Sequence, residues 1–133
     1  MQTSAMTRPS PAASDNDARL ADLLLHHEIA TFNNRYAAAL DELRLTDWTE
    51  MFTDDALYVI LSRENFDKNL PVGLIYCENK GMIRDRAFAL KETAMFAPRY
   101  LRHLIANQAV LSEAADGTIV ARANYVVLHD VLF

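Results

Sequence analysis

The chain has 133 residues, of which 51% are hydrophobic and 23% are charged, and this length and composition are typical of one soluble globular domain. Its formal net charge is −5 and Lys and Arg do not cluster, which argues against nucleic acid or an anionic membrane as a partner. The single cysteine, Cys77, fits a cytoplasmic location, and no apolar run approaches the ~18 residues that span a bilayer.

The first part of the chain predicts a tail followed by a long helix. Residues 1–14 are rich in Ser, Thr, Ala and Pro and are expected to be disordered, whereas residues 15–133 are expected to form a single domain. Ser14 and Asp17 have the spacing of a capping box, which predicts a helix start. An apolar stripe then recurs every three or four residues, as in an amphipathic helix. The stripe consists of Leu25, Ile29, Phe32, Tyr36, Leu40 and Leu43.

Residues 45–59 contain the only tryptophan and mark a corner between a helical layer and a sheet. Asp47 is predicted as the N-cap of a short helix, with Glu50 completing a capping box. Trp48 and Phe52 are four residues apart and therefore share one helix face. A Thr-Asp-Asp turn is expected to end this helix over residues 53–55, and an apolar run to begin a strand over residues 56–61.

The middle of the chain predicts a loop, a strand and a second helix. The polar stretch 62–71 ends in proline and is typical of a loop. Residues 72–77 are expected to form a short strand in which Gly73 marks a bulge or a close approach of backbone. Residues 79–93 are expected to form a helix whose polar side chains face outward. Its predicted inward residues are Met82, Ile83, Ala87 and Leu90.

The last part of the chain predicts a long β-hairpin. Residues 99–113 and 118–129 are expected to pair through an Asp-Gly turn at residues 115–118. Helices followed by long antiparallel strands indicate an α+β fold, with a curved antiparallel sheet covered on one face by the N-terminal helices. Because the chain ends in the apolar residues 131–133, we expect the domain to be truncated there and to lack its last strands.

Several kinds of chemistry are excluded by residue type. Three glycines do not supply a Gly-rich phosphate loop, and one cysteine does not supply an iron–sulfur or structural zinc site. The stretch His26-His27-Glu28 lacks the second His of a zinc-protease motif, so a solvated helix face is the favoured interpretation. Cys77 lies in an apolar run, which is typical of an inert buried thiol.

Residues 99–105 are the best candidate for a site. On a strand, His103 shares a face with Leu101 and Ile105, and such a histidine is more often a satisfied core or interface residue than a catalyst. The functional alternative is a pocket in which His103, Tyr58 and Asp54 (or its neighbour Asp55) meet as acid, base and hydrogen-bond donor. The charged cluster at residues 84–86 is most simply a solvated helix face, and a subunit contact is the minority alternative.

Three segments carry a resemblance to a known family: residues 47–58, residues 63–66, and residues 82–105 with their Met-Ile-Arg-Asp-Arg and Arg-His motifs. From about Leu25 onward the chain resembles the small (beta) subunits of aromatic-ring-hydroxylating (Rieske non-haem iron) dioxygenases. The second and third segments look closest to the small subunits of salicylate hydroxylases and terephthalate dioxygenases. These proteins belong to the cystatin-like α+β roll superfamily.

The resemblance implies a non-catalytic scaffold within an oxidoreductase that breaks down an aromatic carboxylate of the salicylate, terephthalate or benzoate type. The Rieske cluster and the mononuclear iron would sit in a large (alpha) subunit, served by a reductase and often a ferredoxin, and this subunit would hold no cofactor or metal. Three small and three large subunits would form a hetero-hexamer. The candidate interface residues are Arg84, Arg86, Arg99, Arg102 and His103.

The alternative is a protein of a different class. A stand-alone roll enzyme, acting as an isomerase or dehydratase, would use Tyr58, Asp54 and His103 in its own pocket. Because the roll fold permits both functions, the fold by itself does not decide between them.

Overall fold

The computed structural model describes residues 13–70, 72–94 and 100–129. Helix α1 begins at Ala13, so the predicted cap at Ser14 is wrong. The rest of the predicted tail lies outside the described residues, and so does the apolar end at residues 131–133. The elements are α1 (Ala13–Asp41), α2 (Leu45–Thr49), β1 (Tyr58–Ile60), α3 (Arg63–Asp67), β2 (Ile75–Cys77), α4 (Lys80–Ala94), β3 (Leu101–Glu113) and β4 (Ile119–His129).

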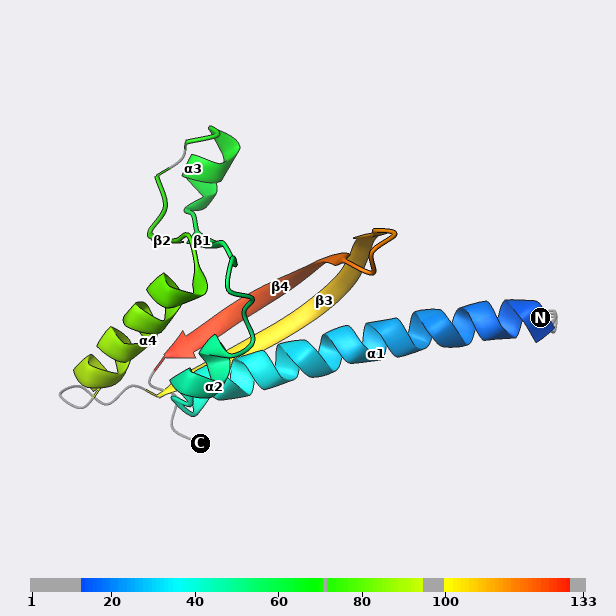
Figure 1. Ribbon diagram of the computed structural model, residues 1–133, viewed down its shortest axis with the longest axis horizontal. Coiled ribbons are helices and arrows are strands. Elements are labelled where there is room, and N and C mark those ends of the chain that lie inside the picture. Colours follow the sequence, from blue (N-terminus) through cyan, green and yellow to red (C-terminus); the bar gives the residue numbers. More distant parts are fainter. Residues whose placement is uncertain (1–12, 71, 95–99, 130–133) are drawn as a thin grey trace, which may run out of the picture.

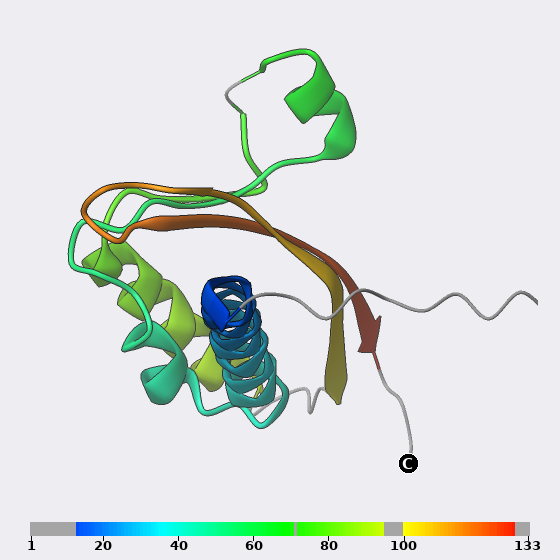
Figure 2. The ribbon, with the colours of Figure 1, turned by 90° about the vertical axis from the view of Figure 1, so that its right-hand side faces the viewer.

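The long β3–β4 hairpin curves around α1, and α2 and α4 lie beside the C-terminal end of that helix (Figures 1 and 2). The curvature has a local cause, because the register shifts between Ala106 and Ala109 and again between Val110 and Ser112. Such bulges bend a strand and increase its twist. The α+β arrangement predicted from the sequence, a curved antiparallel sheet with helices on one face, is therefore confirmed.

The Asp-Gly turn predicted for this hairpin is also confirmed. Gly117 has a φ of 82°, a backbone conformation that glycine adopts without steric cost. The Ala114 N–H donates to the Thr118 carbonyl at 2.8 Å and closes the turn. The Thr118 N–H donates to Asp116 Oδ1 at 2.9 Å, and this hydrogen bond lowers the pKa of the Asp116 carboxyl.

The core lies at the corner, where α1, α2 and α4 meet. Trp48 is 2% exposed and Ile83 is 0% exposed. The Trp48 ring makes edge-to-face contacts with Phe52 at 5.1 Å and with Tyr58 at 5.6 Å between ring centroids. Such pairs contribute about 0.5–1.5 kcal/mol each beyond their burial. The predicted corner around Trp48 and Phe52 is therefore confirmed, but the shared helix face is wrong, because α2 ends at Thr49 and Phe52 lies beyond it rather than in a helix that runs to residues 53–55.

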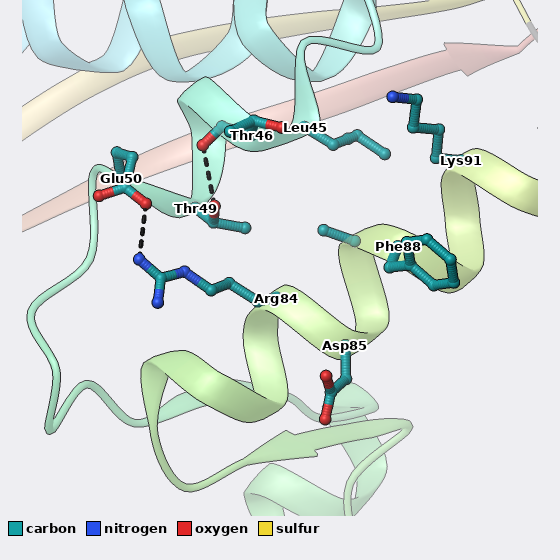
Figure 3. Close-up of a pocket in the computed structure, with 9 residues that line it drawn as sticks. Leu45, Thr46, Thr49, Glu50, Arg84, Asp85, Phe88 and Lys91 are labelled. Atoms are coloured by element: carbon teal, nitrogen blue, oxygen red, sulfur yellow. Dashed lines mark hydrogen bonds and ion pairs between the residues drawn. The ribbon is translucent and has the colours of Figure 1, made fainter.

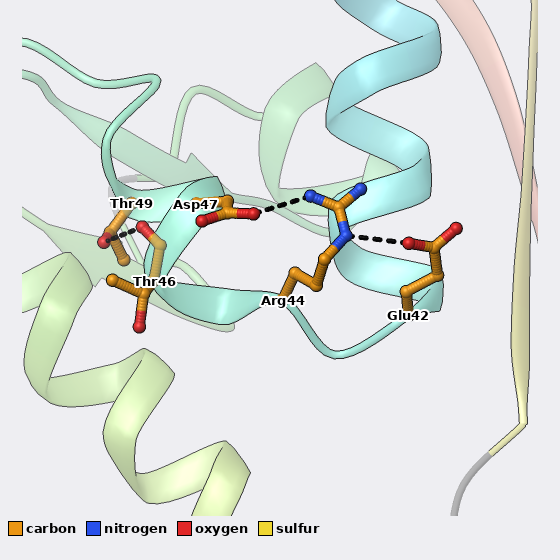
Figure 4. Close-up of polar contacts among 5 residues, drawn as sticks. All are labelled: Glu42, Arg44, Thr46, Asp47 and Thr49. Atoms are coloured by element: carbon orange, nitrogen blue, oxygen red, sulfur yellow. Dashed lines mark hydrogen bonds and ion pairs between the residues drawn. The ribbon is translucent and has the colours of Figure 1, made fainter.

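The capping box predicted for α2 is wrong. The helix begins at Leu45, three residues earlier than expected, and no side chain caps it. Glu50 instead accepts a hydrogen bond from Arg84 on α4 at 2.8 Å (Figure 3). Asp47 lies within the first turn and accepts from Arg44 at 2.7 Å (Figure 4). The reason is that charged donors, Arg44 from the adjacent sequence and Arg84 from α4, compete successfully with backbone N–H groups for these carboxylates.

The loop predicted for residues 62–71 contains a short helix, α3, and this part of the prediction is wrong. Ser62 is its N-cap, because the Asn65 N–H donates to Ser62 Oγ at 3.2 Å. Along the helix, Lys68 donates to Glu64 at 2.6 Å, one of two ion pairs at helical spacing. These local signals outweigh the polar composition that suggested a loop.

The close approach predicted at Gly73 is confirmed, since a Cβ there would lie 2.8 Å from the Ile75 carbonyl oxygen. In α4, Ile83 and Ala87 are buried as predicted. Met82 is 40% exposed, so its predicted inward position is wrong. The Met82 sulfur accepts from the Glu78 N–H at 3.4 Å, so this side chain lies over the helix start and not in the core.

Candidate functional site

A buried acid–histidine pair ties the end of α1 to the start of β3. The His103 side chain is 14% exposed and the Asp41 side chain 10% exposed, and His103 Nδ1 lies 2.6 Å from Asp41 Oδ1. The His103 backbone N–H also donates to both Asp41 oxygens at 3.1 Å. With a proton on Nδ1, the Asp41 carboxylate fixes the orientation of the ring, and Nε2 is the nitrogen left for other partners.

His103 lies in the wall of a cavity of about 480 Å³ between α1 and the inner face of the hairpin. Most of its walls are apolar or aromatic. Their polar groups include three phenols, those of Tyr36, Tyr58 and Tyr125. Burial raises the pKa of Tyr58, and the neighbouring Tyr36 phenol raises it further. The Tyr58 hydroxyl therefore stays protonated at neutral pH, hydrogen-bonded to Tyr36, and is not a base.

A smaller cavity of about 180 Å³ adjoins the larger one, and Tyr58 and His103 line both. Its walls also include Trp48 and Arg86. The indole Nε1–H of Trp48 is buried and has no hydrogen-bond partner among the described residues. A buried donor without a partner costs about 1–3 kcal/mol, so it needs an explanation.

The structure brings together two of the three residues predicted for an enzyme pocket. Tyr58 and His103 line the same cavities. Asp54 is exposed and does not line them, and its carbonyl accepts from the Lys80 N–H at 3.1 Å. The acid beside His103 is Asp41, which sequence reasoning missed. A signal was present, because a carboxylate at a helix C-terminus opposes the helix dipole and needs a partner.

The residues predicted as a subunit interface are spread over different surfaces. Arg84 pairs with Glu50 in a groove of about 380 Å³ between α2 and α4 (Figure 3). Arg86 is exposed at the rim of the smaller cavity, and Arg102 is exposed on β3. His103 faces inward to Asp41. Arg99 lies outside the described residues, and the subunit interface stays a prediction.

Among the described residues, no three His, Cys, Asp or Glu side chains lie close enough together to hold a metal ion. His26 Nδ1 interacts with the Asp22 carbonyl at 2.9 Å on the exposed side of α1. Cys77 is buried in the core, as predicted. Across the described residues, no helix is both long and apolar enough to cross a membrane.

Comparison with known proteins gives one consistent result. A family model described as "Ring hydroxylating beta subunit" matches residues 35–131. The chain is 39% identical over 108 residues to the anthranilate 1,2-dioxygenase small subunit of Burkholderia cepacia, a match that covers 81% of this chain and 66% of that protein. It is 31% identical to subunit beta 2 of the terephthalate 1,2-dioxygenase terminal oxygenase component of a Comamonas species, covering 59% and 51% respectively. The chain thus spans less than two thirds of the length of these relatives.

Solved structures show the same relationship. A beta subunit ascribed to an aromatic-ring-hydroxylating dioxygenase of Novosphingobium aromaticivorans superposes with a TM-score of 0.73 at 37% identity, covering 82% of this chain and 68% of that one. The beta subunit of the benzoate 1,2-dioxygenase of Burkholderia mallei has a TM-score of 0.66 at 24% identity, covering 77% and 66%, and shows the fold alone. The predicted cystatin-like roll is therefore confirmed.

Proposed function

Because the chain belongs to the family of ring-hydroxylating beta subunits, we propose that it is the non-catalytic small subunit of an oxygenase that acts on an aromatic carboxylate. The family match over residues 35–131 is the observation that carries this proposal. The relatives' names, which include anthranilate and terephthalate dioxygenases, support a ring carboxylate as the substrate class.

The partner in this proposal is a large (alpha) subunit that carries the Rieske cluster and the mononuclear iron. The small subunit contributes geometry: it holds three large subunits in register in a hetero-hexamer, and a reductase, with or without a ferredoxin, supplies electrons. Exposed apolar side chains on α1 and on the hairpin support the proposal, because such surface is usually covered by a partner subunit. Examples are Leu20, Leu23, Leu24, Leu104 and Val126. The cytoplasmic location predicted from Cys77 stays a prediction.

Co-expression tests this assignment directly. The full chain is expressed with the product of a neighbouring Rieske large-subunit gene, and the mass of the purified assembly is measured by native mass spectrometry. We expect a complex of both chains that hydroxylates an aromatic carboxylate when a reductase is supplied. Failure of the two chains to co-purify would contradict the scaffold role.

A stand-alone isomerase or dehydratase is the second candidate, and one observation favours it. The Asp41–His103 pair lies beside a cavity that also holds Tyr58, which resembles an acid–base arrangement. In that function Asp41 would take the place predicted for Asp54. Turnover of a hydroxylated or keto substrate by the purified chain alone, abolished by His103→Gln, would favour this candidate over the scaffold.

A further inference from the structure

The first turns of α1 carry leucines that the fold leaves more than half exposed. Leu20, Leu23 and Leu24 are 56%, 65% and 53% exposed. Every side chain from Ser14 to Leu24 is exposed, and Figure 1 shows this part of the helix running past the β3–β4 turn. A helical segment of this length is marginal in water by itself, so a packing partner would stabilise it. We call Leu20, Leu23 and Leu24 the leucine face.

The leucine face lies on the side of α1 that points away from the hairpin. Leu25 and Ile29 mark the side toward the hairpin, because they line a cavity together with residues of β4. A helix turns by about 100° per residue, so Leu20 lies about 140° from Leu25 and about 180° from Ile29 around the axis. Packing of α1 against the hairpin therefore does not cover the leucine face.

The spacing of the leucine face is typical of a helix that docks in a groove. Its members stand at i, i+3 and i+4, which are the anchor positions of that binding mode. A coiled coil with a second copy would need an apolar seam over three or more heptads. The seam through Leu20 and Leu24 continues to His27 and Thr31, which are polar. The patch is thus long enough for a groove and too short for a coiled coil.

The charge around the leucine face favours a cationic partner. Residues 14–28 carry four acidic side chains and one arginine. Asp17 and Glu28 border the leucine face, and neither forms an ion pair within the described part of the chain. Pairing with a second copy would bring two negative segments together, and such like-charge contacts are unfavourable. Lysine or arginine at the rim of a groove would complement both carboxylates.

We propose that the leucine face docks in an apolar groove, rimmed by lysine or arginine, on the large (alpha) subunit. The leucines fill the groove, and Asp17 and Glu28 pair with the cations at its rim. This inference rests on the proposed function, because that function supplies the partner. It assigns the contact to the first turns of α1, away from the outer face of the hairpin.

Isothermal titration calorimetry measures the binding of the full 133-residue chain to the purified large subunit. Leu20→Gln with Leu24→Gln should weaken binding at least about tenfold, because two apolar anchors are lost. Glutamine has nearly the helix propensity of leucine, so the helix itself is retained. Ser14→Gln with Ala18→Gln is the matched control: it places the same side chains on the opposite side of the same exposed turns and should change binding less than about twofold.

A second pair of variants tests the cationic rim of the groove. Asp17→Lys with Glu28→Lys should weaken binding at least about tenfold at physiological salt, because attraction at the rim becomes repulsion. Asp15→Lys with Asp22→Lys makes the same change of charge on the opposite side of the helix. Because salt screens charges over about 8 Å, this control should change binding less than about threefold.

Hydrogen exchange gives a readout that does not depend on a substitution. In the isolated chain the amides of residues 14–24 lie on an exposed segment, which opens readily. In the complex with the large subunit these amides should exchange at least about tenfold more slowly, because docking holds the helix closed.

The outcomes that overturn the inference differ from the one that overturns the proposed function. If the original chain binds the large subunit and the Leu20→Gln, Leu24→Gln variant binds equally well, the leucine face is not the contact and the subunit role stands. Unchanged exchange of residues 14–24 in the complex has the same meaning. If the variant loses self-association but keeps the large subunit, a second copy occupies the face. If the original chain does not bind the large subunit, both proposals fail.

Discussion

At the scale of single residues, Ile83 is the side chain through which α4 is most deeply buried in the core. Ile83 is the largest fully buried side chain among the described residues and packs in the cluster formed around Trp48. Removal of its branched side chain leaves a cavity that the surrounding helices fill only in part. The cost of such a change therefore measures how tightly α4 packs at the corner.

We expect Ile83→Ala to lower the free energy of unfolding by roughly 2–5 kcal/mol, and Ile83→Val by about 0.5–1.5 kcal/mol. Urea denaturation followed by the fluorescence of Trp48 measures both values. Phe88→Ala is the control on the same helix: Phe88 is 66% exposed, so this change should stay within about 0.5 kcal/mol. Equal effects at the two positions would contradict the packing described here.

The Glu50 carboxylate is hydrogen-bonded to two cations of α4. Hydrogen bonds from Arg84 and Lys80 lower the pKa of Glu50 to about 2, from an ordinary value of 4.5. Since the folded-state pKa is depressed, the ionised carboxylate stabilises the fold above about pH 4.5, and this stabilisation is lost as the pH falls toward 2.

A urea series between pH 2 and pH 7 tests this dependence at constant ionic strength. In Glu50→Gln the decline in stability below about pH 4.5 should be shallower than in the original chain. Glu92→Gln removes the same charge from an exposed position on α4 and should leave the decline unchanged. A pH profile of Glu50→Gln that matches the original chain would show that the ion pairs do not form in solution.

At the scale of elements, the hairpin depends on its turn as well as on its strands. Gly117 lies at a positive φ, and nothing lies within 4 Å of a Cβ built there, so the constraint at this position is conformational and not steric crowding by neighbours. The opposite holds at Gly73, where the limit is the nearby Ile75 carbonyl. The two glycines are thus required for different physical reasons.

Gly117→Ala should therefore destabilise the fold by about 1–2 kcal/mol, the cost of a left-handed backbone for an L-residue with a Cβ. Gly117→Asn should recover part of that loss, because asparagine adopts this conformation more readily. Thermal or urea unfolding of the two variants gives the comparison. If Asn proved no better than Ala, the turn would not hold the positive φ in solution.

At the scale of the whole molecule, part of the outer face of the hairpin is apolar and exposed. Leu104 and Val126 are register partners, and both are more than half exposed on the face opposite His103. Contiguous apolar surface of this kind marks a protein interface. We therefore expect the isolated chain to self-associate through this face.

The double variant Leu104→Lys and Val126→Lys should weaken self-association by about tenfold or more, because two charges would have to be desolvated at the contact. Analytical ultracentrifugation over a range of concentrations measures the dissociation constant. Ala114→Lys with Thr118→Lys adds the same charge at the exposed turn and is the control. Equal weakening in both double variants would indicate charge repulsion and not a specific interface.

The sequence by itself determined the helical stripe of α1, the corner at Trp48 and the Asp-Gly hairpin, because each depends on periodicity or turn chemistry within a few residues. The family resemblance was likewise carried by short motifs. Only the tertiary structure decided which charged groups meet. Asp41 and His103 are 62 positions apart, and Glu50 and Arg84 are 34 apart. Such pairings depend on how α1, α4 and β3 pack, and no local pattern encodes the distance between them.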